Sequence, residues 1–126
     1  MEIAAGVDIL YIDRLKRALG RDDKAFLDSV YSQAEQEAAG QKPVPLIYYA
    51  TRFAGKEAVI KALSRCEGEL RFNEIEILTE EGGAPFVRLS GDVKRAAEEQ
   101  SLTGISISLS SDTDYAIAFA TANFGK

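Results

Sequence analysis

The sequence predicts an α+β fold in which a mostly antiparallel sheet wraps around one long central helix. The chain has 126 residues, of which 46% are hydrophobic, so a single domain with its own core is expected over residues 1–126. Apolar patterns follow the order strand, helices, strands, helix and hairpin, which is typical of α+β proteins. The longest helical pattern, residues 45–65, is apolar on much of its circumference and therefore suits the centre of the core.

The first half of the chain reads as a strand followed by helices. Ile12, Leu15 and Leu19 recur at helical spacing. Arg14 and Arg17 lie on another, basic face, which continues past Gly20 if the helix extends through that glycine. Gly40 and the prolines after it break the helical pattern, and a proline suits the start of the next helix. The expected elements are a strand over 3–10 and helices over 11–20, 24–39 and 45–65.

The second half is dominated by strands. Gly82 and Gly83 mark a turn, and a Ser-Ser-Asp-Thr-Asp segment separates the last two strands as in a hairpin. The expected elements are strands over 72–78, 85–89, 105–109 and 115–120 and a polar helix over 91–100.

The composition limits the chemistry that the chain can perform. It contains no His, and Cys66 is its one cysteine. These counts exclude a disulfide framework, a zinc site with the usual nitrogen and sulfur ligands, and a Ser-His-Asp triad. Any chemistry must therefore use carboxylates, amines, hydroxyls and a hard cation.

Charge and hydropathy indicate where partners are expected. The formal net charge is −5, which disfavours a nucleic-acid partner. Two basic islands, residues 13–24 and 52–71, suggest two surfaces for anions, although solvated helix faces explain the same pattern. No signal-peptide pattern opens the chain, and no apolar run approaches the roughly 18 residues that a membrane span needs. We expect a cytoplasmic protein without a membrane partner.

Two carboxylates stand in apolar surroundings. Asp8 interrupts the first strand, and Gly6 on the same face would let another element approach closely, but Asp8 could also end the strand and cap the next helix. Glu57 lies in the long helix, with Lys61 one turn later, which suits either a site or a surface salt bridge. Together they fit a magnesium and phosphate site, because Mg²⁺ takes one or two carboxylates plus phosphate oxygens.

Four segments, in order and spacing, resemble the holo-acyl-carrier-protein synthases, small single-domain 4′-phosphopantetheinyl transferases. They are GVDILYIDRL, TRFAGKEAVIKALS, FNEIEILTEEGGAPFVRL and ISISLSSDTDYAIAFA. The resemblance runs from Gly6 to about Phe119. It implies magnesium-dependent transfer of phosphopantetheine from coenzyme A to a serine of an acyl carrier protein, with release of 3′,5′-ADP. It also implies a homotrimer with sites at subunit boundaries.

The resemblance implies roles for particular residues. Asp8 and Glu57 match the magnesium ligands, and with Lys61 they form the catalytic set; Glu57 or a water on the metal would take the serine proton. Arg14 and Arg21 match basic positions on the first helix that in the family face the acidic carrier protein. The charge pattern independently gives a basic face of Arg14, Arg17, Arg21 and Lys24, which suits docking of an acidic partner. The coenzyme A positions are Arg52, Lys61, Ser64, Gly83, Pro85 and Ser111.

The chain departs from the family pattern on the nucleotide side. Ser111 stands where many members have His, Ala84 replaces the lysine of a Gly-Lys-Pro turn, and Ser29 replaces an arginine. Residues 64–66 replace a Gly-Thr-Gly segment. Arg65 or Arg88 would have to compensate for the lost contacts. A divergent relative that binds coenzyme A or the carrier without efficient transfer, and an unrelated α+β interaction protein, are the alternatives.

Overall fold

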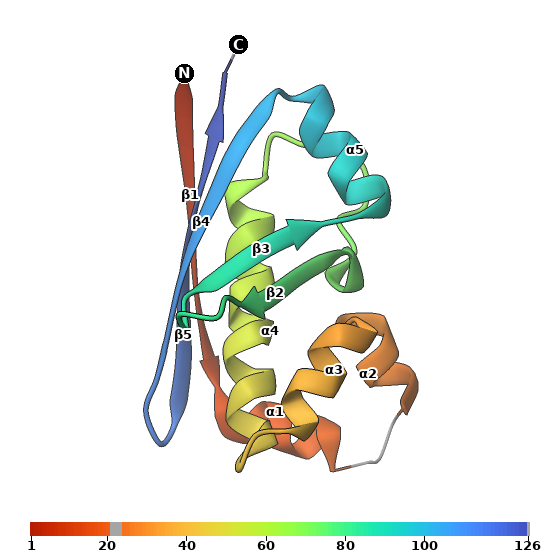
Figure 1. The fold of residues 1–126 in the computed structure, drawn as a ribbon, viewed down its shortest axis with the longest axis vertical. Helices are drawn as coiled ribbons and strands as arrows, with labels where there is room; N and C mark the ends of the chain where they lie inside the picture. The colour runs from red at the N-terminus through yellow and green to blue at the C-terminus, as the bar shows by residue number, and fades with distance from the viewer. Residues whose placement is uncertain (21–23, 126) are drawn as a thin grey trace.

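The long helix α4 (Pro45–Ala62) is the axis around which the other elements pack (Figure 1). The computed structural model describes residues 1–20 and 24–125. The remaining helices are α1 (Ile12–Leu19), α2 (Lys24–Val30), α3 (Gln33–Gly40), the 3₁₀ turn η1 (Phe72–Glu74) and α5 (Gly91–Glu99). The strands are β1 (Glu2–Tyr11), β2 (Ile75–Thr79), β3 (Pro85–Leu89), β4 (Leu102–Ser111) and β5 (Tyr115–Phe124).

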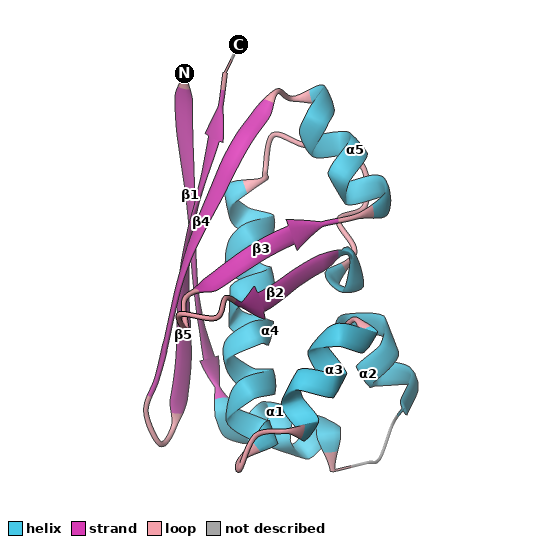
Figure 2. Cartoon of the chain, in the orientation of Figure 1, coloured by secondary structure: helices cyan, strands magenta, loops and turns pink. Residues whose placement is uncertain are grey.

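The strands form two antiparallel sheets on different sides of α4 (Figure 2). The larger sheet has the order β1-β5-β4, with Asp8 opposite Ala118 and Leu109 opposite the same alanine. The smaller sheet pairs β2 with β3. Helices α1, α2 and α3 gather near one end of α4 and α5 near the other, where both chain termini also lie (Figure 1). The predicted fold class is confirmed.

Small residues let α4 lie close to the larger sheet. β5 alternates buried alanines with large exposed side chains, so the alanines face the helix and the large residues face away. The facing side of α4 is also rich in alanine, and the buried alanines at this contact are Ala50, Ala54, Ala58, Ala116, Ala118, Ala120 and Ala122. In this part of the core, small side chains let the backbones of α4 and the sheet lie close together. The large side chains of β5 lie on the outer face of the sheet.

Three local predictions were wrong. The expected helix over 24–39 is two helices, because Ser32 and Glu35 form a capping box that starts α3 anew. Helix α1 ends at Leu19, so the basic face does not continue through Gly20 on one helix. Residues 72–74, expected to be extended, form η1, and β2 begins only at Ile75. The other expected elements are present, with β4 and β5 longer than predicted.

Within the described ranges 1–20 and 24–125, none of the helices combines the length and apolar character needed to cross a membrane.

Candidate active site

Gly6 brings strand β1 into direct contact with helix α4. A Cβ atom at Gly6 would lie 2.0 Å from the Ala58 carbonyl oxygen and 2.8 Å from the Lys61 Cβ. Real Cβ atoms do not approach backbone that closely, so only glycine fits at this crossing. Since side chains alternate along a strand, Asp8 points to the same side as Gly6 and faces the C-terminal half of α4. The element that was expected to approach Gly6 closely is therefore helix α4.

Asp8, Glu57 and Lys61 meet beside this crossing. The Lys61 ammonium donates to the Val7 carbonyl oxygen at 2.9 Å and lies 3.4 Å from Asp8 Oδ1. The Asp8 side chain is only 19% exposed, whereas that of Lys61 is half exposed. Burial, followed by the charge of Asp8, raises the pKa of Glu57, and the nearby Lys61 ammonium partly offsets that rise. One carboxylate on β1 and a carboxylate and an ammonium on α4 thus share one electrostatic environment.

Two structural explanations considered for these residues, a cap or strand end at Asp8 and an ion pair between Glu57 and Lys61, do not hold. The N-cap of α1 is Tyr11, and the first helical N–H, that of Ile12, bonds to the Asp114 carbonyl oxygen at 2.8 Å. Asp8 therefore neither ends β1 nor caps α1. Within the part of the chain that the structure describes, the ion pair of Lys61 is with Asp8 and not with Glu57. The i,i+4 surface salt bridge considered for Glu57 is accordingly not formed.

The donor set of this site fits a hard divalent cation. Nowhere in residues 1–20 and 24–125 do three or more His, Cys, Asp or Glu side chains come together as a complete metal site. Asp8 and Glu57 offer two carboxylates whose charges interact, and Mg²⁺ is commonly held by one or two protein carboxylates while water and phosphate oxygens complete its shell. The pair suits magnesium that arrives with a phosphorylated substrate.

A second feature, on another side of α4, is a cavity of about 660 Å³. It lies between the N-terminal half of α4, the β2–β3 turn and the end of β4. Four of the predicted coenzyme A positions line it together: Arg52, Gly83, Pro85 and Ser111. Residues far apart in sequence thus converge on one hollow of a size that suits a small-molecule ligand.

Arg52 is held firmly in the wall of this cavity. Its Nη2 donates to Thr79 Oγ1 at 2.8 Å, and its Nε donates to the Ile77 carbonyl oxygen at 3.4 Å. The guanidinium carbon lies 3.9 Å from the centre of the Tyr48 ring, within the range of a cation–π contact. The positive charge is therefore fixed in place before any ligand arrives.

The remaining two coenzyme A positions lie elsewhere. Lys61 is beside Asp8, and Ser64 is exposed just beyond the end of α4; neither lines the cavity. At about 3.6 residues per turn, Glu57 stands roughly 140° around the helix axis from Arg52. One chain consequently carries two separate groups, the carboxylate group (Asp8, Glu57, Lys61) and the cavity.

Comparison with known proteins places this arrangement in a family. A family model described as the 4′-phosphopantetheinyl transferase superfamily matches residues 4–120. A holo-[acyl-carrier-protein] synthase of Ruminiclostridium cellulolyticum is 41% identical over 127 residues, covering 99% of this chain and 95% of its own. The chain belongs to the holo-acyl-carrier-protein synthase family. The resemblance stated from the four sequence segments is confirmed, and the family is one of enzymes.

Solved structures of holo-acyl-carrier-protein synthases share the whole fold. An ACPS–CoA complex of Chronobacterium ammoniagenes superposes with a TM-score of 0.87 at 28% identity, covering 100% of both chains. A Helicobacter pylori holo-[acyl-carrier-protein] synthase in complex with coenzyme A has a TM-score of 0.81 at 32% identity, covering 94% of this chain and 99% of its own. Two similar folds were thus solved with this coenzyme bound.

The basic residues expected at the carrier surface are split between helices. Arg14 is exposed on α1, while Arg17 on the same helix forms an ion pair with Asp13 at 2.8 Å. Lys24 begins α2 and pairs with Asp28 at 2.7 Å. Arg21 lies outside the described residues. Two of these cations are thus partly neutralised on their own helices, whereas Arg14 presents its charge to solvent.

Tyr48 and Lys42 are among the residues lining the cavity that sequence reasoning missed. Tyr48 is buried under Arg52, and Lys42 stands at the cavity edge just before α4 begins. Tyr48 is one turn before Arg52 on the predicted helix, so the spacing contained a signal for it. Lys42 lies in the loop after α3, and the periodicity of apolar residues cannot predict where a loop side chain points.

Proposed function

We propose that this protein transfers 4′-phosphopantetheine from coenzyme A to a serine of an acyl carrier protein and releases 3′,5′-ADP, with Mg²⁺ as cofactor. The observation that carries the proposal is the meeting of Asp8, Glu57 and Lys61 where Gly6 lets β1 touch α4. Binding of coenzyme A, named for two of the similar structures, supports the choice of donor. The proposal treats residues 1–126 as one transferase domain.

Each residue of the carboxylate group has a distinct task. Asp8 and Glu57 would hold the metal, which when bound offsets charge on the coenzyme pyrophosphate. Lys61, half exposed and already beside Asp8, supplies a further positive charge to the phosphates. The carrier serine oxygen forms a bond to the β-phosphorus as the bond to the bridging oxygen breaks, and that oxygen leaves on 3′,5′-ADP. Glu57 or a water on the metal would accept the serine proton.

We further infer that the working form is a homotrimer whose sites lie between subunits. The outer face of the larger sheet is strongly apolar, and its most exposed large side chains are Ile3, Val7, Ile9, Tyr11, Tyr115, Ile117 and Phe119. A continuous exposed patch of this kind marks an interface. The two groups on different sides of α4 would then be joined, with the cavity of one copy facing the carboxylate group of the next.

The deciding experiment is a transfer assay. Apo carrier protein is incubated with coenzyme A, Mg²⁺ and this protein, and the phosphopantetheine mass shift on the carrier is followed by mass spectrometry. Asp8→Ala and Glu57→Ala should each abolish magnesium-dependent transfer, because each removes one of the two carboxylates. Glu2→Ala, on the same strand and the same face but at its exposed end, is the matched control and should leave transfer unchanged.

Several outcomes separate the alternatives. Measurable coenzyme A binding with no mass shift on several carriers would identify a divergent binder and overturn the transferase. Normal transfer by Asp8→Ala or Glu57→Ala would refute the metal site. For the carrier surface, Arg14→Glu should raise the apparent KM for carrier much more than that for coenzyme A, because charge complementarity acts on the carrier encounter. Equal effects on both KM values would count against docking at Arg14.

A further inference from the structure

Lys61 lies on one of the two carboxylates proposed to hold the metal. Its ammonium is 3.4 Å from Asp8 Oδ1, and within residues 1–20 and 24–125 this is the ion pair of Asp8. Burial and the charge of Asp8 raise the pKa of Glu57, and the charge of Lys61 opposes that rise. One positive charge of the chain therefore acts on both carboxylates.

We propose that Lys61 makes the binding of the divalent cation and of the coenzyme cooperative, because its ammonium competes with the cation for Asp8 until the coenzyme phosphates draw it away. The inference deepens the proposed function and rests on it. It gives Lys61 a second task besides its contact with phosphate, namely to keep the cation from binding tightly on its own.

An ammonium and a divalent cation cannot share Asp8 without a cost. Both would lie within a few ångströms of the same carboxylate, and at that separation like charges repel strongly. The Asp8 side chain is only 19% exposed, so water and salt screen this repulsion less than they would at an open surface. A cation that binds Asp8 must therefore displace Lys61 or bind beside it with lower affinity.

The side chain of Lys61 is fixed at its base and free at its end. A Cβ atom at Gly6 would lie 2.8 Å from the Lys61 Cβ, which shows how closely the base of this lysine packs against β1. The side chain as a whole is half exposed. Its 3.4 Å contact with Asp8 is longer than the roughly 2.7–2.9 Å of a strong charge-assisted hydrogen bond. The ammonium can thus leave Asp8 while the helix and the strand stay in place.

Lys56 on the same helix shows the opposite arrangement. Its side chain is fully buried, and its ammonium lies 2.7 Å from Glu35 Oε1 and 2.9 Å from the Phe72 carbonyl oxygen. Such a lysine is committed to the fold, because breaking its ion pair would leave buried charges unpaired. The longer and more exposed pair of Lys61 with Asp8 costs little to break.

Phosphate offers Lys61 a stronger partner than Asp8 does. A pyrophosphate carries more negative charge than one carboxylate, and a lysine binds phosphate as a mobile point charge. When the ammonium turns toward the phosphates, Asp8 becomes available to the cation. Coupling between two ligands is reciprocal, so a cation held on Asp8 also favours the contact of Lys61 with phosphate.

Binding of Mn²⁺ alone to the full-length protein, followed by electron paramagnetic resonance of the free ion, tests this competition. Lys61→Gln removes the charge but keeps an N–H donor for the Val7 carbonyl oxygen. Mn²⁺ should bind Lys61→Gln about fivefold more tightly than the unmodified protein, the upper end of the effect of an exposed ion pair. Lys61→Arg keeps the charge and should bind Mn²⁺ like the unmodified protein.

Two further variants locate the effect. Adding Asp8→Asn to Lys61→Gln should abolish the gain, because the carboxylate that Lys61 releases is then absent. Lys94→Gln, at an exposed lysine on α5, removes the same charge elsewhere and should leave the Mn²⁺ affinity unchanged. With coenzyme A present and no carrier, the factor by which the coenzyme strengthens Mn²⁺ binding should be at least fivefold smaller in Lys61→Gln than in the unmodified protein.

The outcomes distinguish this inference from the function on which it rests. Unchanged or weaker binding of Mn²⁺ alone to Lys61→Gln would overturn the inference, because a lysine that serves only phosphate or only Val7 does not compete with the cation. The transferase can stand in that case. An equal gain in Lys94→Gln would also overturn it, since the effect would then follow net charge. If neither the unmodified protein nor Lys61→Gln binds Mn²⁺ even with coenzyme A, the proposed metal site and the inference fail together.

Discussion

Gly6 sets how close β1 and α4 can come, and with it the distance between Asp8 and its partners. Gly6→Ala would place a methyl group 2.0 Å from the Ala58 carbonyl oxygen, and backbone on both sides leaves no flexible side chain to yield. We expect a loss of about 3 kcal/mol in the free energy of unfolding, the upper end of the usual cost of overpacking. Transfer activity should fall further, because the strand that carries Asp8 must move away from Glu57.

Gly40→Ala is the matched control for this substitution. Gly40 ends α3, and a Cβ atom there meets nothing within 4 Å, so the variant should be as stable as the unmodified protein or slightly more so. Urea unfolding measures both variants. A Gly6→Ala protein with unchanged stability and full transfer would show that the crossing of β1 and α4 does not determine the site.

At the scale of single residues, the sequence indicated which residues are unusual better than it indicated which residues they contact. Gly6, Asp8, Glu57 and Lys61 were all identified, because a carboxylate in an apolar strand and a glycine beside it are unusual in themselves. The pairing of Lys61 with Asp8 was not predicted, because it joins residues far apart in the sequence and depends on how β1 crosses α4. Helical spacing pointed instead to Glu57.

The junction of α3, α4 and β2 depends on one buried ion pair. Lys56 and Glu35 have fully buried side chains, and the Lys56 ammonium donates to Glu35 Oε1 at 2.7 Å and to the Phe72 carbonyl oxygen at 2.9 Å. Glu35 also accepts from the backbone N–H groups of Ser32 and Ile77. One carboxylate thus caps α3, fixes it to α4 and anchors β2, although burial lowers the pKa of Lys56.

We expect Lys56→Met to cost about 3–5 kcal/mol in the free energy of unfolding, because it leaves a buried carboxylate without its counter-charge. Glu35→Gln should also be costly, and the double variant should lose less than the two single losses combined, since each removes a partner that the other needs. Urea unfolding of all three variants measures the coupling. If the losses in the free energy of unfolding were strictly additive, the network would be contradicted. Arg17→Met, at an exposed ion pair on α1, is the control and should cause no measurable change in that free energy.

The division of residues 24–39 shows why elements were harder to delimit than to detect. The apolar set of Phe26, Leu27, Val30 and Tyr31 continues at helical spacing, so periodicity alone predicted one helix. The break comes from the Ser32 capping box and from the tertiary contacts of Glu35. The periodicity of apolar residues does not encode either of them. The S-x-x-E pattern at residues 32–35 was nevertheless a local signal for a new helix start.

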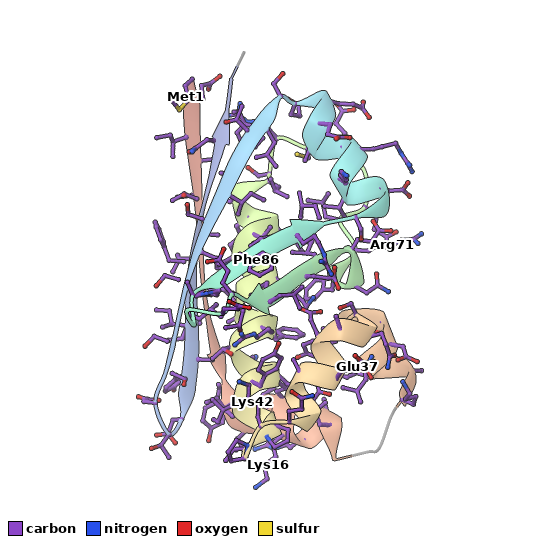
Figure 3. The ribbon with its side chains drawn as sticks, in the orientation of Figure 1. Met1, Lys16, Glu37, Lys42, Arg71 and Phe86 are labelled. Atoms are coloured by element: carbon purple, nitrogen blue, oxygen red, sulfur yellow. The ribbon has the colours of Figure 1, made fainter. Side chains whose placement is uncertain are left out.

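On the scale of the whole molecule, the larger sheet is packed on one side only. Side chains project from its outer side, away from α4, and within the described chain no helix covers them (Figure 3). Ile3 and Ile9 are 68% and 63% exposed, and the adjacent strand adds Phe119 at 48%. On β4 the outward positions are serines, so the apolar surface is confined to β1 and β5. Water is an unfavourable neighbour for so much β-branched and aromatic surface, which favours association through this face.

A charge placed in this surface tests the homotrimer. Ile9→Glu points away from the core, so the fold should remain while burial of the carboxylate in an interface becomes costly. Light scattering on a sizing column should show a trimer for the unmodified protein and a smaller species for Ile9→Glu. Lys94→Glu on α5 is the control and should remain trimeric. If sites form between subunits, Ile9→Glu should also lose transfer although Asp8, Glu57 and Lys61 are unchanged. A monomeric unmodified protein, or a trimeric and fully active Ile9→Glu, would refute assembly through this sheet face.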